Sequence, residues 1–329
     1  MPDEDAAEVD RERPGDAADT DGRERTTDGA ESGGRARAPD GAEERRSDGP
    51  DTDERARRVR TAQTRAESKL VGDSLAVGYP STDEPVVECE TVVLPEGEIT
   101  ALVGPNGSGK STLLKAMANQ LSPERGRIVL DGTAIQSMDA KELARRLGLL
   151  SQENSSPGSL TVEELIYHGR YPHRGFFDSL GEADHAAVDR AIDLAGVGDL
   201  RDKEMGNLSG GQKQLVWIAM VLAQETDLLL LDEPTTFLDL HHQLRVMEVV
   251  RTLNDEQGVT VGIVLHDIGQ AARFADNLVA MKDGGLYDWG PPRDVVTGEL
   301  LADVFRVDAT VDRESPTGPH ISPHRALDE

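Results

Sequence analysis

The segment GPNGSGKS, at residues 104–111, constrains the fold of this chain more than any other feature. It directly follows the apolar run Ile99–Val103 and opens a stretch with helical periodicity, which is the strand, loop and helix context of a phosphate-binding loop. Glycines let backbone N–H groups face phosphate oxygens, and the N-terminus of the following helix adds about half a positive charge. We therefore expect an α/β fold in which this loop binds a nucleoside triphosphate.

Each side chain of the loop has an expected task. Lys110 is predicted to reach the β- and γ-phosphates, and Ser111 to offer its hydroxyl to Mg²⁺, a hard ion that prefers oxygen ligands. The residues expected to bind the nucleotide here are Gly104, Pro105, Asn106, Gly107, Ser108, Gly109, Lys110, Ser111 and Thr112.

Short apolar runs and helical stretches alternate from residue 67 onward, which is typical of α/β domains. The expected strands are Ile99–Val103, Ile128–Leu130, Leu228–Leu231, Val261–Leu265 and Leu278–Met281. The expected helices are Ser111–Gln120, Ala140–Arg146, Val162–His168, Ala183–Ala195, Gln212–Ala223, His241–Leu253 and Ile268–Ala275. No strand is expected between Gln152 and Asn207, so this part is predicted to be a helical insertion.

Two carboxylates, Asp232 and Glu233, follow the most apolar strand, LLLL. One interpretation is a strand-end turn capped by Asp. The other fits a phosphate-binding loop better, because such a site needs one carboxylate near Mg²⁺ and can use another to polarise the attacking water. We expect Asp232 at the metal site and Glu233 as general base.

Charge and composition exclude several classes of protein. The chain has 62 acidic and 35 basic residues, a net charge of -27 and one cysteine. With one cysteine there is no disulfide framework, and we expect neither a membrane-spanning segment nor a secretory signal, and hence a cytoplasmic location. Nucleic acid is an unexpected partner for so acidic a chain. Cys89 is expected to be partly buried and inert, and the pairs His241/His242 and His320/His324 lack metal-ligand spacing.

The acidity has two parts. Residues 1–66 hold 19 acidic and 13 basic side chains and almost no large apolar residue, so this tail is predicted to be disordered. The rest is acidic as well, and only 7 of the 35 basic residues are Lys. Such a surface resembles proteins of salt-loving microbes, which suggests a halophilic archaeal source. An acidic patch that meets a basic partner is the alternative.

The motif LSGGQ at 208–212, between the phosphate-binding loop and the sequence DEP, resembles the ATP-binding cassette (ABC) ATPases, and the similarity covers about residues 69–310. The resemblance implies a P-loop NTPase (RecA-like) core, an antiparallel β subdomain and a helical insertion. It implies an ATPase domain over 67–329, with a helical subdomain at 153–207 and a C-terminal extension at 285–329.

The same resemblance implies roles for further residues. Ser209, Gly210, Gly211 and Gln212 would bind the ATP held by a second copy of the chain, and Asp239 would cross the interface between the copies. Tyr79 would stack on adenine, with an ordinary strand-end tyrosine as the alternative. Gln152 would join the Mg²⁺ site to the helical insertion, and His266 would sense the γ-phosphate. The catalytic set is then Glu233, His266, Lys110 and Gln152, and the metal set is Ser111, Gln152 and Asp232.

Less specific sequence segments, such as GRYPHRGFF and VLHDIGQAARFADNLVAM, are similar to those of ATPases of ferric-siderophore, haem and cobalamin importers. Siderophore uptake is the first expectation, with cobalamin or haem as alternative cargo. The implied partners are a second copy, membrane-spanning permease subunits at the cytoplasmic face, and an extracellular binding protein. The stretch from Gln152 to Phe177 would receive the permease, and the aromatic loop YPHRGFF is either a docking surface or ordinary surface. A non-transport ABC ATPase and a nucleotide-binding regulator remain as other classes.

Overall fold

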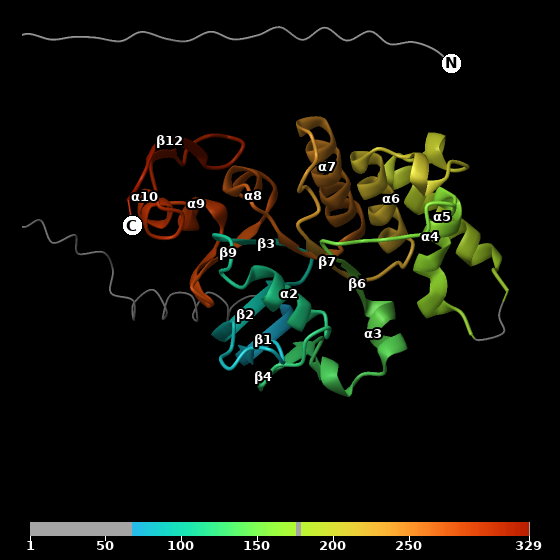
Figure 1. Ribbon diagram of the computed structural model, residues 1–329, viewed down its shortest axis with the longest axis horizontal. Helices are drawn as coiled ribbons and strands as arrows, with labels where there is room; N and C mark the ends of the chain where they lie inside the picture. Colours follow the sequence, from blue (N-terminus) through green and yellow to red (C-terminus); the bar gives the residue numbers. More distant parts are fainter. Residues whose placement is uncertain (1–67, 176–178, 329) are drawn as a thin grey trace, which may run out of the picture. The chain divides into compact units, whose positions relative to one another are not determined.

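A six-stranded sheet, in the order β10-β9-β3-β8-β7-β6, forms the centre of the structure (Figure 1). Strands β9, β3, β8, β7 and β6 are parallel to one another, and β10 pairs antiparallel with β9 at the edge. The bounds are β3 Ile99–Val103, β6 Leu147–Leu150, β7 Leu228–Asp232, β8 Thr260–Val264, β9 Asn277–Lys282 and β10 Gly285–Gly290. The computed structural model describes residues 68–175 and 179–328; the expected disordered tail and two residues of the aromatic loop, Phe176 and Phe177, lie outside them.

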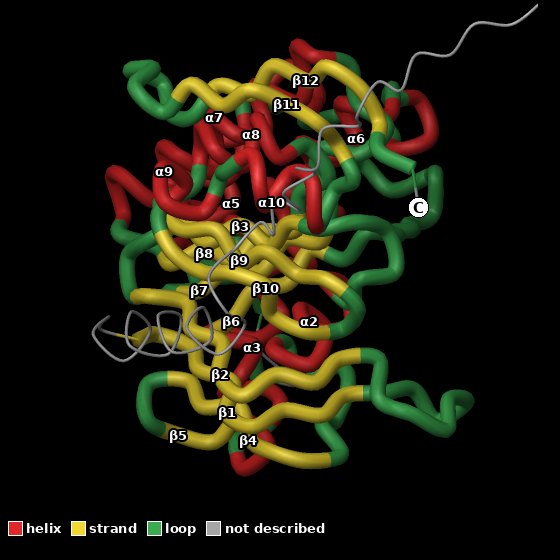
Figure 2. Tube along the Cα trace, turned by 90° about the vertical axis from the view of Figure 1, so that its left-hand side faces the viewer, coloured by secondary structure: helices red, strands yellow, loops and turns green. Residues whose placement is uncertain are grey.

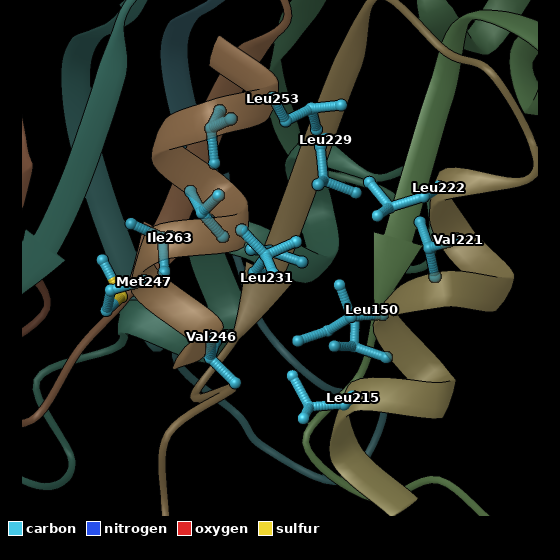
Figure 3. Packing of buried hydrophobic residues seen from close by; sticks show 14 of the residues in the cluster. Leu150, Leu215, Val221, Leu222, Leu229, Leu231, Val246, Met247, Leu253 and Ile263 are labelled. Carbon is cyan, nitrogen blue, oxygen red and sulfur yellow. The ribbon is translucent and has the colours of Figure 1, made fainter. Parts of the chain in front are cut away.

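Both faces of this sheet are buried. Along β7, Leu229 and Leu231 belong to one apolar cluster, whereas Leu228 and Leu230 belong to another. Successive side chains of a strand point to opposite faces, so a strand covered on both sides reads as a continuous apolar run. Figure 3 shows Leu231 with Leu215 of α6 and Val246 of α7 in the first cluster.

A smaller antiparallel sheet, in the order β2-β1-β4-β5, packs through α2 (Lys110–Met117) against the other face. Its strands are β1 Ser68–Val77, β2 Val87–Pro95, β4 Arg125–Leu130 and β5 Thr133–Ala134. In the register, Leu70 lies opposite both Leu94 and Leu130. Figure 2 shows the two sheets as separate layers with α2 between them. The expected antiparallel β part and α/β core are confirmed.

Helices without strands follow β6, as expected. They are α4 Val162–Tyr167, the 3-10 segment η2 His168–His173, α5 Glu182–Ala195 and α6 Gly210–Leu222, with short 3-10 turns η3 Gly198–Leu200 and η4 Met205–Asn207. Helix α4 begins with a capping box, in which Thr161 and Glu164 bond each other's backbone N–H. The exact limits 153–207 of a helical subdomain stay a prediction.

The remaining elements flank the central sheet. They are η1 Ile135–Ser137, α3 Ala140–Arg146, α7 Leu240–Gln257, α8 Ile268–Phe274, α9 Pro292–Val295, α10 Gly298–Asp303 and the hairpin β11 Val307–Asp312 with β12 His320–Ala326. The expected extension from residue 285 starts with β10, which is hydrogen-bonded to the central sheet. No helix in the described ranges combines the length and the apolar character needed to cross a bilayer.

Candidate active site

The phosphate-binding loop connects β3 to α2 and contains two glycines, Gly104 and Gly109, at which any other residue would force neighbouring atoms to move. Gly104 and Gly109 have φ angles of +153° and +94°. A Cβ atom at Gly104 would lie 2.3 Å from the carbonyl oxygen of Met281, and one at Gly109 would lie 2.5 Å from Val87. The loop therefore follows a path that only glycine allows, next to β9 and β2.

Lys110 is the first residue of α2, and the whole residue is only 5% exposed. Its Nζ donates hydrogen bonds to the carbonyl oxygens of Gly104 and Pro105, both at 2.9 Å. Burial lowers the pKa of the Lys110 ammonium, and the nearby carboxylates of Glu233 and Asp232 act in the opposite direction. The structure thus holds a cation within the loop where phosphates are expected.

Asp232 is the last residue of β7 and lies beside the start of α2. Its Oδ1 accepts a hydrogen bond of 2.8 Å from Ser111 Oγ, while its buried Oδ2 has no hydrogen-bond partner. Burial raises the pKa of the Asp232 carboxyl, and the bond from Ser111 partly opposes this. A buried carboxylate oxygen without a partner, next to a hydroxyl, is a set of hard oxygen donors that fits Mg²⁺.

Side chains that follow three neighbouring strands converge at Glu233. Its Oε2 accepts hydrogen bonds from Gln152 Nε2 at 2.7 Å and Thr236 Oγ1 at 3.2 Å. His266 Nε2 lies 2.7 Å from the same oxygen. Gln152 follows β6 and His266 follows β8, so the carboxyl ends of adjacent parallel strands bring these side chains together, as is usual for sites in α/β sheets.

Two further residues extend this group. Thr236 was not predicted, although it stands only three residues after Glu233 in DEPTTF, where a turn would return its hydroxyl to the carboxylate. Tyr79 follows β1, and its hydroxyl is 3.3 Å from Thr112 Oγ1 at the start of α2. The structure thus brings Tyr79, the phosphate-binding loop, Asp232, Glu233, Gln152 and His266 into one site.

The residues expected to act on a second copy form another group. Ser209 caps α6: its Oγ accepts from Gln212 N–H, and Gln212 Oε1 accepts from Ser209 N–H. Asp239 caps α7, and its Oδ1 lies 2.9 Å from the backbone nitrogen and 2.8 Å from Nδ1 of His242. These bonds lower the pKa of the Asp239 carboxyl.

The His242 ring contacts both capped helix ends, through Asp239 at the start of α7 and Gly211 at the start of α6. A Cβ atom at Gly211 would lie 2.4 Å from the His242 ring, so the imidazole packs directly on the α6 backbone. From the sequence alone, His242 is expected only near the start of the helix His241–Leu253. Its position three residues after the capping Asp239 was the available signal, because a side chain there returns to the cap.

Comparison with known proteins places this geometry in a family. The sequence profile of the ABC transporter family matches residues 90–236. The ferric enterobactin transport ATP-binding protein FepC of Escherichia coli is 45% identical over 242 residues, which are 74% of this chain and 89% of that protein. The cobalamin import ATP-binding protein BtuD of Halobacterium salinarum is 38% identical over 223 residues, 68% of this chain and 56% of that protein.

Solved structures agree with the sequence matches. An ABC transporter in an inward-facing conformation has a TM-score of 0.67 at 27% identity, over 79% of this chain and 98% of that chain. A dimeric bacterial ABC transporter cassette has a TM-score of 0.60 at 28% identity, over 68% and 98%. With 45% identity across most of a transport ATP-binding protein, and with the fold of solved cassettes, this chain belongs to the ABC transporter family as one of its ATPases.

Proposed function

We propose that this chain powers an importer of ferric siderophores by binding and hydrolysing ATP between two of its copies. The observation that carries the proposal is the convergence of Gln152, Thr236 and His266 on one oxygen of Glu233, beside the phosphate-binding loop. A carboxylate oxygen that accepts hydrogen bonds from Gln152 and Thr236 and lies 2.7 Å from His266 is held in position for a proton transfer. The choice of cargo is supported by the similarity to FepC.

In the proposed mechanism, the loop N–H groups and Lys110 bind the phosphates and Tyr79 contacts the adenine. Glu233 accepts a proton from the water that attacks the γ-phosphate, the bond between the γ-phosphorus and the bridging oxygen breaks, and ADP leaves; His266 and Gln152 hold the carboxylate and sense the phosphate. The roles of Glu233, His266 and Gln152 are supported by their contacts at the Glu233 Oε2 atom.

The proposed metal ligands are Ser111, Asp232 and Gln152. When bound, Mg²⁺ neutralises charge on the transferred phosphoryl group. Within residues 68–175 and 179–328 no three His, Cys, Asp or Glu side chains form a metal cluster. The unpartnered Asp232 Oδ2 and the Ser111 hydroxyl supply few ligands, which suits an ion that completes its shell with nucleotide oxygens and water.

The second group of residues is proposed to complete the ATP site of another copy. Its members are Ser209, Gly210, Gly211, Gln212 and Asp239. Exposure supports this role, since the Asp239 side chain is 68% exposed and its neighbours Phe237 and Leu240 are 99% and 70% exposed. Large apolar side chains in solvent beside a charged cap are typical of a contact surface.

Mixing two inactive variants tests this action between copies. Chains with Lys110→Ala lose their own ATP site, and chains with Ser209→Arg lose their signature motif. A mixed dimer keeps one intact site, formed by Lys110 of one copy and Ser209 of the other. We expect ATP turnover to return on mixing, although each variant alone is inactive. If Ser209 acts on its own copy's ATP, no mixing ratio restores turnover.

The proposed partners of the dimer are membrane-spanning permease subunits, which would hold the chain at the cytoplasmic face, and an extracellular binding protein. The stretch from Gln152 to Phe177 is the proposed receiving surface for the permease, and Tyr171 in it is 57% exposed. Cobalamin is the alternative cargo, because BtuD is also similar to this chain. An affinity tag on the chain should co-purify membrane-spanning subunits, whereas a soluble partner alone would favour a non-transport ABC ATPase.

The acidic, Lys-poor composition supports a source that lives in high salt. The chain has a net charge of -27 over 329 residues, so its acidic side chains repel one another at low ionic strength. Molar salt screens this repulsion, because it shortens the screening length to about 3 Å. We expect the purified chain to hold its fold in molar KCl and to lose it on dialysis into dilute buffer. Equal thermal stability in both buffers would contradict a halophilic source.

A further inference from the structure

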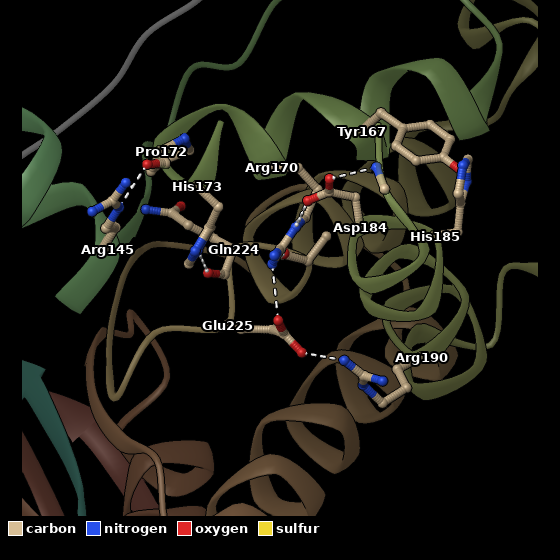
Figure 4. A network of polar contacts seen from close by, with 12 residues as sticks. Arg145, Tyr167, Arg170, Pro172, His173, Asp184, His185, Arg190, Gln224 and Glu225 are labelled. Carbon is tan, nitrogen blue, oxygen red and sulfur yellow. Dashed lines mark hydrogen bonds and ion pairs between the residues drawn. The ribbon is translucent and has the colours of Figure 1, made fainter. Parts of the chain in front are cut away.

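Segment η2 carries a buried charge that the ATP site does not use. Arg170 is 4% exposed, and its Nε donates to Asp184 Oδ1 of α5 at 3.0 Å. Its Nη1 donates to the carbonyl oxygen of Ala223 at 2.7 Å and to Glu225 Oε2 at 2.9 Å (Figure 4). Because burial of a charge is unfavourable unless it is paired and hydrogen-bonded, these partners fix the guanidinium in place.

Two neighbours of Arg170 contact the same end of α6. A Cβ atom at Gly169 would lie 2.0 Å from the carbonyl oxygen of Met220, so the η2 backbone rests directly on the last turn of the helix. His173 Nε2 lies 2.7 Å from the carbonyl oxygen of Gln224 (Figure 4). Segment η2 therefore contacts the last turn of α6 at Met220 and the residues 223–225 that directly follow this helix.

Segment η2 is also attached to the core. Arg145 Nε of α3 donates to the carbonyl oxygen of Pro172 at 2.7 Å, and Gln224 Nε2 donates to that of Leu147 in β6 at 3.2 Å. The side chain of Lys141 in α3 bonds the carbonyl oxygen of Arg174. The end of α6, η2 and α3 thus form one polar network that spans the helical region and the central sheet.

An exposed aromatic side chain projects from this network. Tyr171 stacks on His168, with ring centroids 4.9 Å apart and planes at 22°, and is 57% exposed. In the described part of the chain it is one of three large apolar side chains that are largely exposed, together with Phe237 and Leu240 near the caps. An exposed tyrosine is well suited to bind another protein.

We propose that Arg170 is a positioning residue that fastens the permease-contacting segment η2 to α6, so that force at Tyr171 reaches Ser209 at the other end of this helix. The inference rests on the proposed function, in which the permease binds here. Helix α6 has 13 residues and is about 20 Å long, and its continuous backbone hydrogen bonds connect its two ends. Movement of η2 would therefore shift the signature motif toward or away from the ATP of the other copy.

The test compares ATP turnover of the free chain with turnover of the complex purified through a tag on this chain and reconstituted in liposomes. We expect Arg170→Met to leave the turnover and nucleotide binding of the free chain unchanged, but to lower the stimulation by the permease about fivefold or more. Arg190→Met is the matched control, because Arg190 pairs with the same Glu225 from the surface and its side chain is 58% exposed. It should keep full stimulation.

Two milder variants keep the inference testable if Arg170→Met does not fold. His173→Leu removes one attachment to α6, and Glu225→Gln removes the charge that Arg170 pairs with. Both should lower stimulation without lowering the free rate. Full stimulation in every one of these variants that folds would overturn the role of Arg170. If the wild-type chain brings down no membrane subunit, or gains no turnover from one, the proposed function fails instead.

Discussion

Replacement of Glu233 by Gln separates ATP binding from ATP hydrolysis. The Oε2 atom of Glu233 is an acceptor for Gln152 and Thr236 and lies beside His266. A glutamine keeps one amide oxygen for these donors, so the arrangement persists. The variant loses the negative charge and the proton acceptor. We therefore expect it to fold, to bind ATP and to hydrolyse almost none.

The magnitude follows from the two roles of the carboxylate. A positioned general base contributes about 10²–10⁴-fold to a rate, which is about 3–5 kcal/mol of activation free energy at 1.36 kcal/mol per tenfold. For stability, hydrogen bonds to a carboxylate are stronger than those to an amide by roughly 1 kcal/mol each. Removal of the charge also relieves repulsion of Asp232, whose pKa Glu233 helps to raise. The free energy of unfolding should change by less than about 2 kcal/mol.

The assay measures phosphate release, the affinity for a fluorescent ATP analogue, and mass by light scattering with ATP and Mg²⁺. Glu233→Gln should bind ATP like the wild type and accumulate as a dimer, because hydrolysis no longer separates the copies. Glu153→Gln is the matched control, since Glu153 is an exposed carboxylate beside Gln152. Full turnover by Glu233→Gln would refute its role as base.

Three other predictions concern packing, reactivity and pH. Gly211→Ala should lower the free energy of unfolding by roughly 1–3 kcal/mol, because the new Cβ would lie 2.4 Å from the His242 ring. A Cβ at Gly210 meets open space, so Gly210→Ala is the control. Equal melting temperatures for both variants would contradict the packing of His242 on Gly211. Burial raises the pKa of Cys89 to about 12 from 9.0, so at pH 8 roughly 1 in 10,000 thiols is ionised instead of about 1 in 10, and labelling by a thiol reagent should be slow until denaturant is added. Fast labelling of the native chain would show an accessible thiolate. Hydrogen bonds from the Gly181 N–H and from Arg170 lower the pKa of Asp184, so its carboxylate stabilises the fold above the unfolded-state value of about 3.9, and this contribution is lost as the pH falls through the folded-state pKa. Asp184→Asn should therefore unfold at lower urea concentration at pH 7 and differ less from the wild type near pH 3; an unchanged difference would contradict the assignment.

The predicted strands of the central sheet are present because burial on both faces leaves a local signal. LLLL at 228–231 and Ile99–Val103 are continuous apolar runs, and each became a strand with every residue buried. Strand β1 was not among the predicted strands, since its sequence SKLVGDSLAV contains Gly72, Asp73 and Ser74 and its pairing shifts register there. The hairpin of β11 and β12 is largely exposed and has no apolar run to mark it.

The residues of the candidate site were predicted from motifs, but the contacts that position those residues were not. Gln152 and Glu233 are 81 residues apart, and only the resemblance placed them together before the structure showed their hydrogen bond. The partners of Arg170 lie up to 55 residues away and belong to no motif. A sequence pattern reports periodicity and local turns, whereas such contacts depend on how helices and strands pack.

Uptake by living cells tests the central claim most directly. Cells that lack this chain, and cells in which it is restored, are given radiolabelled ferric siderophore, with labelled cobalamin and haem in parallel. We predict loss of ferric-siderophore uptake alone, with recovery by the wild-type chain and none by Glu233→Gln. Loss of cobalamin or haem uptake instead would contradict the siderophore cargo, and unchanged uptake of all three, with no redundant importer in the cells, would contradict the importer function.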